Sequence, residues 1–419
     1  MGMPLLEEAH AAGEQLVRVL VPEVSAIQVA VPQISPFVGL LFDVARVGPL
    51  EAVTAPPYDT ISPADQRRYL DASPYNVIRL ELGEEAPGDD EQDNKYRRAA
   101  GWIRRWTDEG ALVRTPSPSY YPYELTFALH GAQRRVRGLV CAVDVEPWGG
   151  RIVPHERTMP GPVDDRLRLI REVRGNLSCI QAVFGGPCEP LVRMLDRASG
   201  GRPLAEVVDD EGVRHRLWST GPDDEVEAWM GDRHLMIADG HHRYATALRY
   251  RDEMRVQHGA GPWDRVMMLL VDASDDLPVL PFHRVVTRAP APPQGVRVRG
   301  LEEVLAEVDD DELRFGIVAR GDDGRMFHSV GQLDGDPPAV LALHAGALHG
   351  RDDDLRFTHD AVEAEEAVRR GDAVAAVLLP PTKASRIREV VERGARLPQK
   401  STFFWPKPRT GLVMRPFDA

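Results

Sequence analysis

The stretch MIADGHHRYATAL, residues 236–248, predicts a strand that ends in an acid and turns at once into a helix. Met236 to Ala238 are apolar, Gly240 permits a tight turn, and His241 opens a run typical of a helix. The first backbone N–H groups of a helix have no partner within the helix and carry partial positive charge. We therefore expect an anion site at this turn, where phosphate is a common ligand.

Charged and polar side chains flank this turn. His241, His242 and Arg243 add phosphate-binding groups, while Asp239 is placed to hold a divalent metal or a substrate hydroxyl. Positioning and charge neutralisation of this kind are what phosphoryl-transfer sites require. The alternative is structural: Asp239 caps the helix, and the histidines and the arginine are solvated on its surface.

The composition indicates a soluble globular protein. The chain has 419 residues, a net charge of −14 and 43% hydrophobic residues, which suits two domains. The acidic balance opposes binding to nucleic acid or an anionic membrane and leaves room for a local basic pocket that binds a small anion. The sequence has neither an apolar run long enough to span a membrane nor the pattern of a signal peptide. The three cysteines suit neither a zinc site nor a disulfide framework, so we expect a cytoplasmic protein.

Short apolar runs, hairpin signals and amphipathic helices alternate irregularly, which favours an α+β fold over a doubly wound sheet. We predict an N-terminal extension at residues 1–33, a mixed-sheet core with helices at 34–290, and a C-terminal α/β region at 291–419. The tail of that region is a candidate to close over the site. The stretch 287–300, rich in proline and glycine, is the predicted linker. Within the core, NVIRLEL (76–82) alternates like a half-buried strand.

A second motif, PHERT (154–158), presents a carboxylate among positive groups. Glu156 is the predicted general base, which would accept a proton from an attacking hydroxyl. His155 beside it and Arg166, ten residues further on, are predicted to join the anion pocket. The motif is not HExxH, which excludes a zinc protease of that type. Glu81 is the competing base, and a surface loop held by a salt bridge is the structural alternative.

The tail segment QKSTFFWPKP (399–408) mixes phosphate-type donors with aromatic rings. Lys400 and Ser401 are its predicted phosphate-binding residues, and Lys407 lies in the same run. The segment admits closure over a nucleotide or substrate, binding of single-stranded nucleic acid, or packing as a structural tail. The net charge favours the nucleotide over nucleic acid.

An upstream turn, APPYDTIS (55–62), carries two further candidates. Tyr58 is suited to stacking on a base and Asp59 to binding a metal. Turn formation alone also explains the prolines and the serine.

These motifs carry a family resemblance. ADGHHRYATAL resembles the nucleotide-binding motif of ParB/sulfiredoxin-type proteins, in which an Asp-Gly-His-His-Arg loop opens a helix; partition proteins, sulfiredoxins and free-serine kinases are members. The whole chain is similar to the family called domain of unknown function 1015. The matching stretches are APPYDTIS, NVIRLELG, PHERTMPGPVDDRL, ADGHHRYATAL, LPFHRVV and LPQKSTFFWPKPRTGLV.

The resemblance implies a ParB/sulfiredoxin-like fold and a nucleotide-dependent phosphotransferase that acts on a small hydroxylated metabolite. Free L-serine is the acceptor that it favours, with ATP, ADP or another phosphate donor and Mg²⁺. In this interpretation Glu156 is the base and Asp239 holds Mg²⁺ or orients the hydroxyl. Gly240, His241, His242 and Arg243 bind the phosphates, with His155, Arg166, Lys400 and Ser401 assisting.

Two alternatives belong to other functional classes. One is a nucleotide-binding regulatory switch of the ParB-like superfamily without kinase chemistry. The other is a DNA-binding partition adaptor, which the acidic balance and the lack of a basic helix-turn-helix oppose. The expected partners are a small-molecule substrate and a nucleotide, with no membrane, and a homodimer is one possible assembly.

Overall fold

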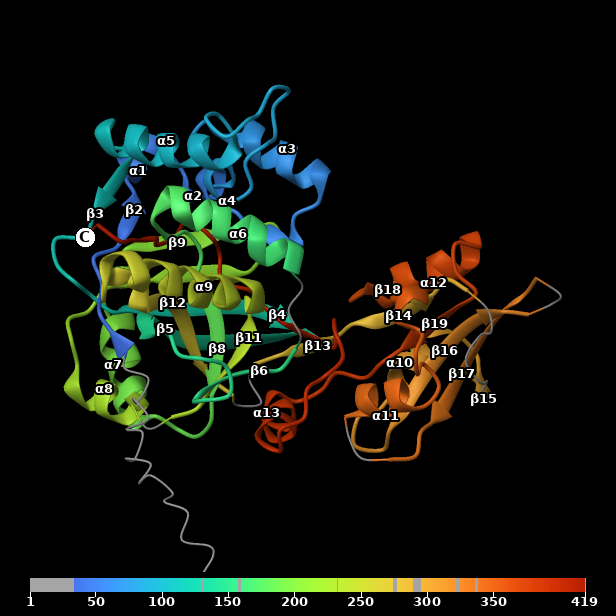
Figure 1. Ribbon diagram of the computed structural model, residues 1–419. Helices are drawn as coiled ribbons and strands as arrows, with labels where there is room; N and C mark the ends of the chain where they lie inside the picture. The colour runs from blue at the N-terminus through green and yellow to red at the C-terminus, as the bar shows by residue number, and fades with distance from the viewer. Residues whose placement is uncertain are drawn as a thin grey trace, which may run out of the picture. The chain divides into compact units, whose positions relative to one another are not determined.

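The computed structural model describes residues 34–129, 131–156, 160–231, 233–273, 277–288, 295–321, 324–335 and 338–418. The predicted N-terminal extension, residues 1–33, lies outside the described residues. Most described strands belong to two large sheets, each of which carries helices (Figure 1). The predicted α+β class is therefore confirmed. No described helix is both long and apolar enough to cross a membrane.

The first sheet is mixed and has nine strands, in the order β6-β11-β8-β12-β5-β4-β10-β9, with β1 paired to β5. Its strands are β1 (Ile34–Ser35), β4 (Tyr121–Leu129), β5 (Ala132–Asp144), β6 (Ile152–Pro154), β8 (Ile180–Phe184), β9 (Ala205–Val208), β10 (Arg214–Leu217), β11 (Leu235–Asp239) and β12 (Arg265–Asp272). β6 pairs in parallel with β11, and β8 with β12, whereas the other described pairs are antiparallel.

Both faces of this sheet are covered, because successive residues of its central strands enter different cores. In β5, Leu139, Cys141 and Val143 belong to one hydrophobic cluster, and Val140 and Ala142 belong to another. The helices in this part of the chain are α1 (Val44–Val47), α2 (Leu50–Val53), α3 (Pro63–Ala72), α4 (Ile78–Glu81), α5 (Lys95–Asp108), α6 (Pro160–Val173), α7 (Glu189–Ser199), α8 (Asp224–Gly231) and α9 (His241–His258). α6 and α9 lie side by side (Figure 1). The sheet is therefore packed on both faces, and its strand ends are held in place by two hydrophobic clusters.

The predicted strand at NVIRLEL is wrong, because this segment forms the short helix α4. The Asn76 side chain accepts the N–H of Ile78 at 3.0 Å and donates to the carbonyl of Ala52 at 2.8 Å, which holds the turn that opens the helix. Leu80 and Glu81 are buried in the helix. Tertiary packing against α5 thus overrides a local alternation that is equally compatible with a strand.

The second sheet has six antiparallel strands, in the order β15-β17-β16-β19-β14-β18. They are β14 (His283–Val286), β15 (Val296–Val298), β16 (Arg314–Arg320), β17 (Met326–Gln332), β18 (Leu355–Thr358) and β19 (Ala375–Leu378). The helices are α10 (Leu301–Glu307), α11 (Ala339–Ala345), α12 (Ala361–Arg370) and α13 (Ala384–Glu392). α10 and α12 pack on one face through Val304 and Val368, while α11 and α13 share a different cluster through Leu343 and Ile387. β14 precedes the predicted boundary at residue 290 and yet belongs to this sheet.

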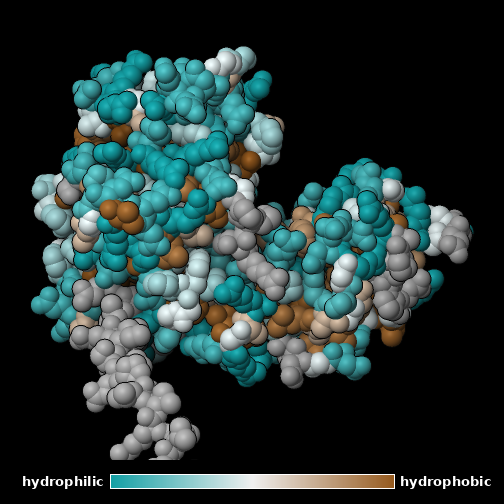
Figure 2. Space-filling model, viewed as in Figure 1, coloured by the Kyte–Doolittle hydropathy of each residue, from teal (hydrophilic) through white to brown (hydrophobic). Residues whose placement is uncertain are grey.

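The tail runs from the second sheet back to the first part of the chain. β20 (Thr402–Phe404) pairs with β13 (Val279–Pro281), and β21 (Arg415–Pro416) pairs with β7 (Gly175–Asn176). Between them, Thr410 forms a bridge with Ala55. β2 (Leu40–Phe42) and β3 (Leu112–Arg114) make a further small pair. The tail is therefore built into the fold along its length. The face of the molecule in Figure 2 is mostly hydrophilic, with apolar residues in small groups.

We predict that Gly138→Ala destabilises the first sheet. A Cβ at Gly138 would stand 2.4 Å from the carbonyl oxygen of Leu270 on β12, so the two central strands must separate. Overpacking of this kind costs about 1–3 kcal/mol. Urea unfolding measures the loss. Gly161→Ala is the control, since nothing lies within 4 Å of its Cβ; equal stability of the two variants would contradict the prediction.

Candidate functional site

The parallel pair β6 and β11 brings the two predicted motifs together. Pro154 is opposite Ile237 in the register, so His155 and Glu156 leave the sheet at the edge where Asp239 ends β11. Carboxyl ends of parallel neighbours meet at one edge of a sheet. This pairing of the strands brings Glu156 close to the Asp-Gly-His-His-Arg loop. The local sequence alone does not reveal that proximity.

Gly240 makes the turn from β11 into α9. Its φ is 95°, in the left-handed region, and a Cβ there would lie 3.0 Å from Nε of Arg243. Glycine is therefore the residue that this turn requires. No side chain in the described part of the chain caps α9, so the structural alternative of an Asp239 cap does not hold. The helix opens with amide groups suited to an anion.

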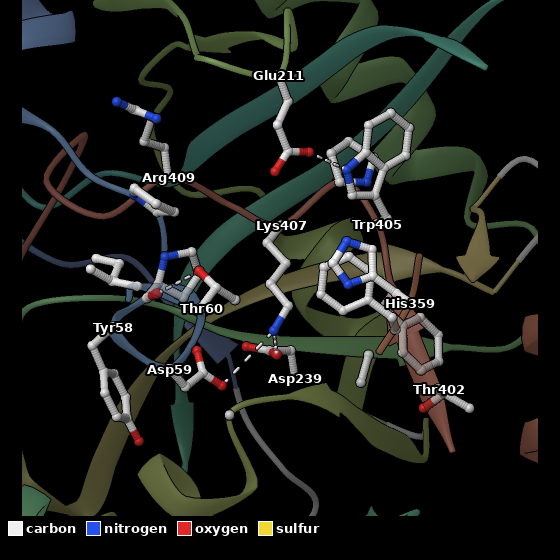
Figure 3. Close-up of a pocket in the computed structure, with 18 of the residues that line it drawn as sticks. Tyr58, Asp59, Thr60, Glu211, Asp239, His359, Thr402, Trp405, Lys407 and Arg409 are labelled. Carbon is white, nitrogen blue, oxygen red and sulfur yellow. Dashed lines mark hydrogen bonds and ion pairs between the residues drawn. The ribbon is translucent and has the colours of Figure 1, made fainter. Parts of the chain in front are cut away.

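The carboxylate of Asp239 is held between two cations. Oδ2 accepts a hydrogen bond from Nη2 of Arg243. Oδ1 accepts one from the ammonium of Lys407 (Figure 3). Burial raises the pKa of Asp239, but the charges of Lys407 and Arg243 outweigh it and hold that pKa well below its usual range. Asp239 is thus ionised and charge-neutralised at the start of α9.

His241 is a buried, neutral imidazole with a polar atom left over. Its ring packs edge-on against His155 with centroids 4.6 Å apart, and its Nε2 has no hydrogen-bond partner in the part of the chain that the structure describes. Burial, followed by the charge of His155, lowers the pKa of His241 to about 3. A buried polar atom without a partner is costly, so the Nε2 of His241 points to a ligand.

Glu156 and His155 are both tied to the tail. Oε1 of Glu156 accepts the backbone N–H of Ser401 at 3.1 Å, and Nε2 of His155 lies 2.7 Å from the Thr402 hydroxyl. Nδ1 of His155 donates to the carbonyl of Ile237 at 2.6 Å, which fixes the position of its proton. Burial raises the pKa of Glu156, but the hydrogen bond and charge of His155 outweigh it, and the pKa is about 2. Glu156 is an ionised hydrogen-bond acceptor.

These groups line a cavity of about 530 Å³. His242, which lies at the start of α9 with a pKa lowered by burial, also lines it, as does the exposed Lys400. The ammonium of Lys400 lies 5.4 Å above the ring of Phe282. Aromatic, acidic and basic residues complete the wall, among them Tyr58, Asp59, Glu211, His359, Phe403, Trp405 and Arg409. The cavity is thus lined by basic, acidic and aromatic side chains.

Two predicted residues turn away from this cavity. The hydroxyl of Ser401 donates to the carbonyl of Pro398 at 2.6 Å, so its contribution to the site is its backbone N–H. The guanidinium of Arg166 donates to Asp165 and to the carbonyl of Glu81, and it lies 4.1 Å from the ring centroid of Tyr58. Neither residue lines the cavity.

Arg166 and Glu81 instead line a separate hollow of about 50 Å³. The Ser178 hydroxyl donates to Glu81 at 3.0 Å and accepts from Arg243 at 3.1 Å, which links this hollow to the start of α9. The structure therefore brings Glu156, and not Glu81, to the cavity at the Asp-Gly-His-His-Arg loop. Outside the cavity, Glu81 is linked to Arg243 through the Ser178 hydroxyl, and Arg166 packs against the ring of Tyr58.

No role was predicted from the sequence for several residues of the site. Arg409 lines the cavity and is held by Tyr123, whose hydroxyl lies 2.8 Å from Nδ1 of His215. Nε2 of His215 in turn lies 3.0 Å from Asp209. These residues are widely separated in the sequence and share no motif. Lys407, by contrast, has a local signal, since it is a basic residue between two prolines that follow an aromatic run.

The predicted Mg²⁺ site does not fit the residues present. Both oxygens of Asp239 are occupied by cations, and Asp59 approaches the ammonium of Lys407 at 3.9 Å rather than sharing an open position with Asp239. Among the described residues, no group of three or more His, Cys, Asp or Glu side chains could hold a metal ion. No step of a reaction is therefore assigned to a metal held by the protein.

We predict that His241 makes the stability of the protein depend on pH. Its pKa is about 3 in the folded chain and about 6.5 when unfolded, so its contribution is complete above pH ~6.5 and is lost as the pH falls towards 3. One proton corresponds to a slope of about 1.4 kcal/mol per pH unit. His241→Gln should remove this slope from urea unfolding measured between those limits. The exposed His258→Gln should retain it, and an unchanged slope in His241→Gln would refute the assignment.

Comparisons with known proteins give the following relationships. No curated protein matches the chain. Among solved structures, "Free serine kinase in complex with AMP" is 14% identical, with a TM-score of 0.33, and the match covers 62% of this chain and 88% of that chain. A variant of free serine kinase in complex with ADP is 15% identical, with a TM-score of 0.32 over 62% and 88%. "SbnI with C-terminal truncation from Staphylococcus aureus" is 11% identical, with a TM-score of 0.37 over 67% and 88%.

The resemblance to a family of unknown function is confirmed, whereas the ParB/sulfiredoxin-like fold stays a prediction. Residues 34–329 match the family described as "Protein of unknown function (DUF1015)". Because this match spans more than half of the chain, the protein belongs to the DUF1015 family.

Proposed function

We propose that this protein is a nucleotide-dependent phosphotransferase that acts on a small hydroxylated metabolite. The observation that carries the proposal is the uncapped start of α9, where the buried Nε2 of His241 has no hydrogen-bond partner among the described residues and His241 lines a cavity of about 530 Å³. Arg243 and Lys407 add positive charge at the same place. A phosphate group supplies oxygen atoms that can accept hydrogen bonds from the first N–H groups of the helix and from the histidine.

The reaction we propose transfers one phosphoryl group to a hydroxyl. The acceptor oxygen attacks the terminal phosphorus, the bond from that phosphorus to the leaving phosphate breaks, and the hydroxyl proton passes to Glu156. His241, His242 and Arg243 bind the phosphates, with Lys400 at the rim. Free L-serine, which would give O-phosphoserine, is the acceptor implied by the ADGHHR motif. ATP, ADP or another phosphate compound is the donor.

Orientation contributes more to this chemistry than basicity. Phosphoryl transfer proceeds through a loose transition state, so positioning and charge stabilisation supply most of the rate. The backbone N–H of Ser401 and the ring of His155 hold Glu156 in place. Arg243 is held by Ser178 and by the carbonyl of Cys179 at 2.7 Å. The groups that would meet the hydroxyl and the phosphate are thus fixed before substrate arrives.

We expect that ADP, ATP or pyrophosphate raises the melting temperature of the purified chain. A ligand at a hundred times its dissociation constant stabilises a protein by about 2.7 kcal/mol. Formation of phosphoserine from L-serine, followed by mass spectrometry, then tests the transfer. Phosphate binding without phosphoserine would support the regulatory-switch alternative, and no shift with any phosphate compound would remove both functions.

Glu156→Gln separates chemistry from binding. The loss of a proton acceptor should lower the rate of phosphoserine formation by roughly 100-fold or more, while the ligand-induced shift in melting temperature persists. Glu225→Gln, which alters an exposed carboxylate paired with Arg193, is the matched control and should keep the wild-type rate. An unaffected rate in Glu156→Gln would exclude Glu156 as the base.

A further inference from the structure

Lys407 occupies the position between two carboxylates that a divalent cation would take. Its ammonium donates to Asp239 and lies 3.9 Å from Asp59, and the side chain points toward both (Figure 3). The same ammonium lies 5.1 Å from the ring centroid of Phe403. Asp59 comes from the turn after Pro57 and Asp239 from the end of β11, so carboxylates from separate elements meet at one lysine.

The two cations at Asp239 differ in how firmly they are held. Arg243 also donates to Ser178 and to the carbonyl of Cys179, which anchors its guanidinium to the sheet. Among the described residues, Asp239 is the one hydrogen-bond partner of the Lys407 ammonium. A lysine has a flexible stem and three donors. Lys407 can therefore leave Asp239, and Asp239 stays paired with Arg243.

Movement of Lys407 away from Asp239 would provide a positive charge for a bound phosphate chain. Asp59 and Asp239 pair with Lys407 and Arg243, and His241 is neutral, so the charges of these two cations are already offset before a ligand binds. An arriving phosphate chain must bring its own cation or draw one from the protein. Mg²⁺ sites in nucleotide-binding proteins supply that cation with one or two carboxylates and the phosphate oxygens. Here the carboxylates already hold an ammonium.

We propose that Lys407 replaces a protein-bound divalent cation, turning from Asp239 onto the phosphate chain, so that phosphate compounds bind without Mg²⁺. This inference rests on the proposed function and adds to it the identity of the neutralising group. It assigns the positive charge that neutralises the phosphate chain to the tail of the protein and not to a metal ion.

The test is calorimetric binding of inorganic pyrophosphate and of ADP to the full chain, in EDTA and in Mg²⁺. Wild-type affinity should change by less than about threefold between the two conditions, because the protein supplies the cation. Lys407→Met should weaken binding in EDTA by roughly tenfold or more, the effect of losing a charge-assisted hydrogen bond. Mg²⁺ should restore part of that loss, since Asp59 and Asp239 are then free to hold it. Lys383→Met, on an exposed lysine outside the cavity, is the matched control.

Each result decides the matter. Wild-type binding that requires Mg²⁺ overturns the inference, as does wild-type affinity of Lys407→Met in EDTA. If Lys407→Met does not fold, Lys407→Arg, which preserves the charge, takes its place. The comparison of wild-type binding in EDTA and in Mg²⁺ decides the inference even without a variant. Pyrophosphate binding in EDTA without phosphoserine formation contradicts the proposed kinase and leaves Lys407 in its role. Phosphoserine formation together with binding that requires Mg²⁺ supports the proposed kinase and contradicts the role of Lys407. If no phosphate compound binds under any condition, the proposed function and the role of Lys407 are both refuted.

Discussion

The parallel pairing of β6 with β11 is the constraint on which the site depends. β6 has only three residues and stands at the end of the sheet order, with β11 as its neighbour. Because these strands run the same way, the residues after Pro154 and the residues after Ile237 leave the sheet together. An antiparallel pairing would send Glu156 to the opposite edge from Asp239. The candidate base and the candidate phosphate site are neighbours only through this register.

The tail forms the other part of the site, because it supplies a hydrogen-bond partner to each of the central side chains. The N–H of Ser401 donates to Glu156, the hydroxyl of Thr402 meets His155, and Lys407 donates to Asp239. Removing one partner from a buried ion pair costs about 3–5 kcal/mol. Asp239 is buried and has two such partners, so docking of the tail and assembly of the site depend on one another. The tail therefore forms part of the wall of the site.

The local parts of this arrangement were predictable from sequence, and the long-range parts were not. MIADGHHRYATAL determines its own strand, turn and helix, because the apolar run, Gly240 and the helix formers all agree. NVIRLEL fits both a helix and a strand, and packing decided in favour of the helix. Ser401 was predicted to bind phosphate, but its hydroxyl donates to the carbonyl of Pro398, a contact that no sequence pattern reveals. Arg166 is taken by Asp165 and the Glu81 carbonyl, contacts that only the fold creates.

The low pKa of Glu156 indicates how such a site would balance positioning against basicity. The groups that hold the carboxylate, the Ser401 N–H and the adjacent His155, also stabilise its charge and so weaken it as a proton acceptor. A reaction that needed early proton removal would be poorly served by this arrangement, since a base works best with a pKa near the working pH. In a loose phosphoryl transfer the attacking hydroxyl keeps its proton until late, and an ionised, fixed acceptor is sufficient. The hydrogen bonds that make Glu156 a weak base therefore suit it to orienting a hydroxyl for phosphoryl transfer.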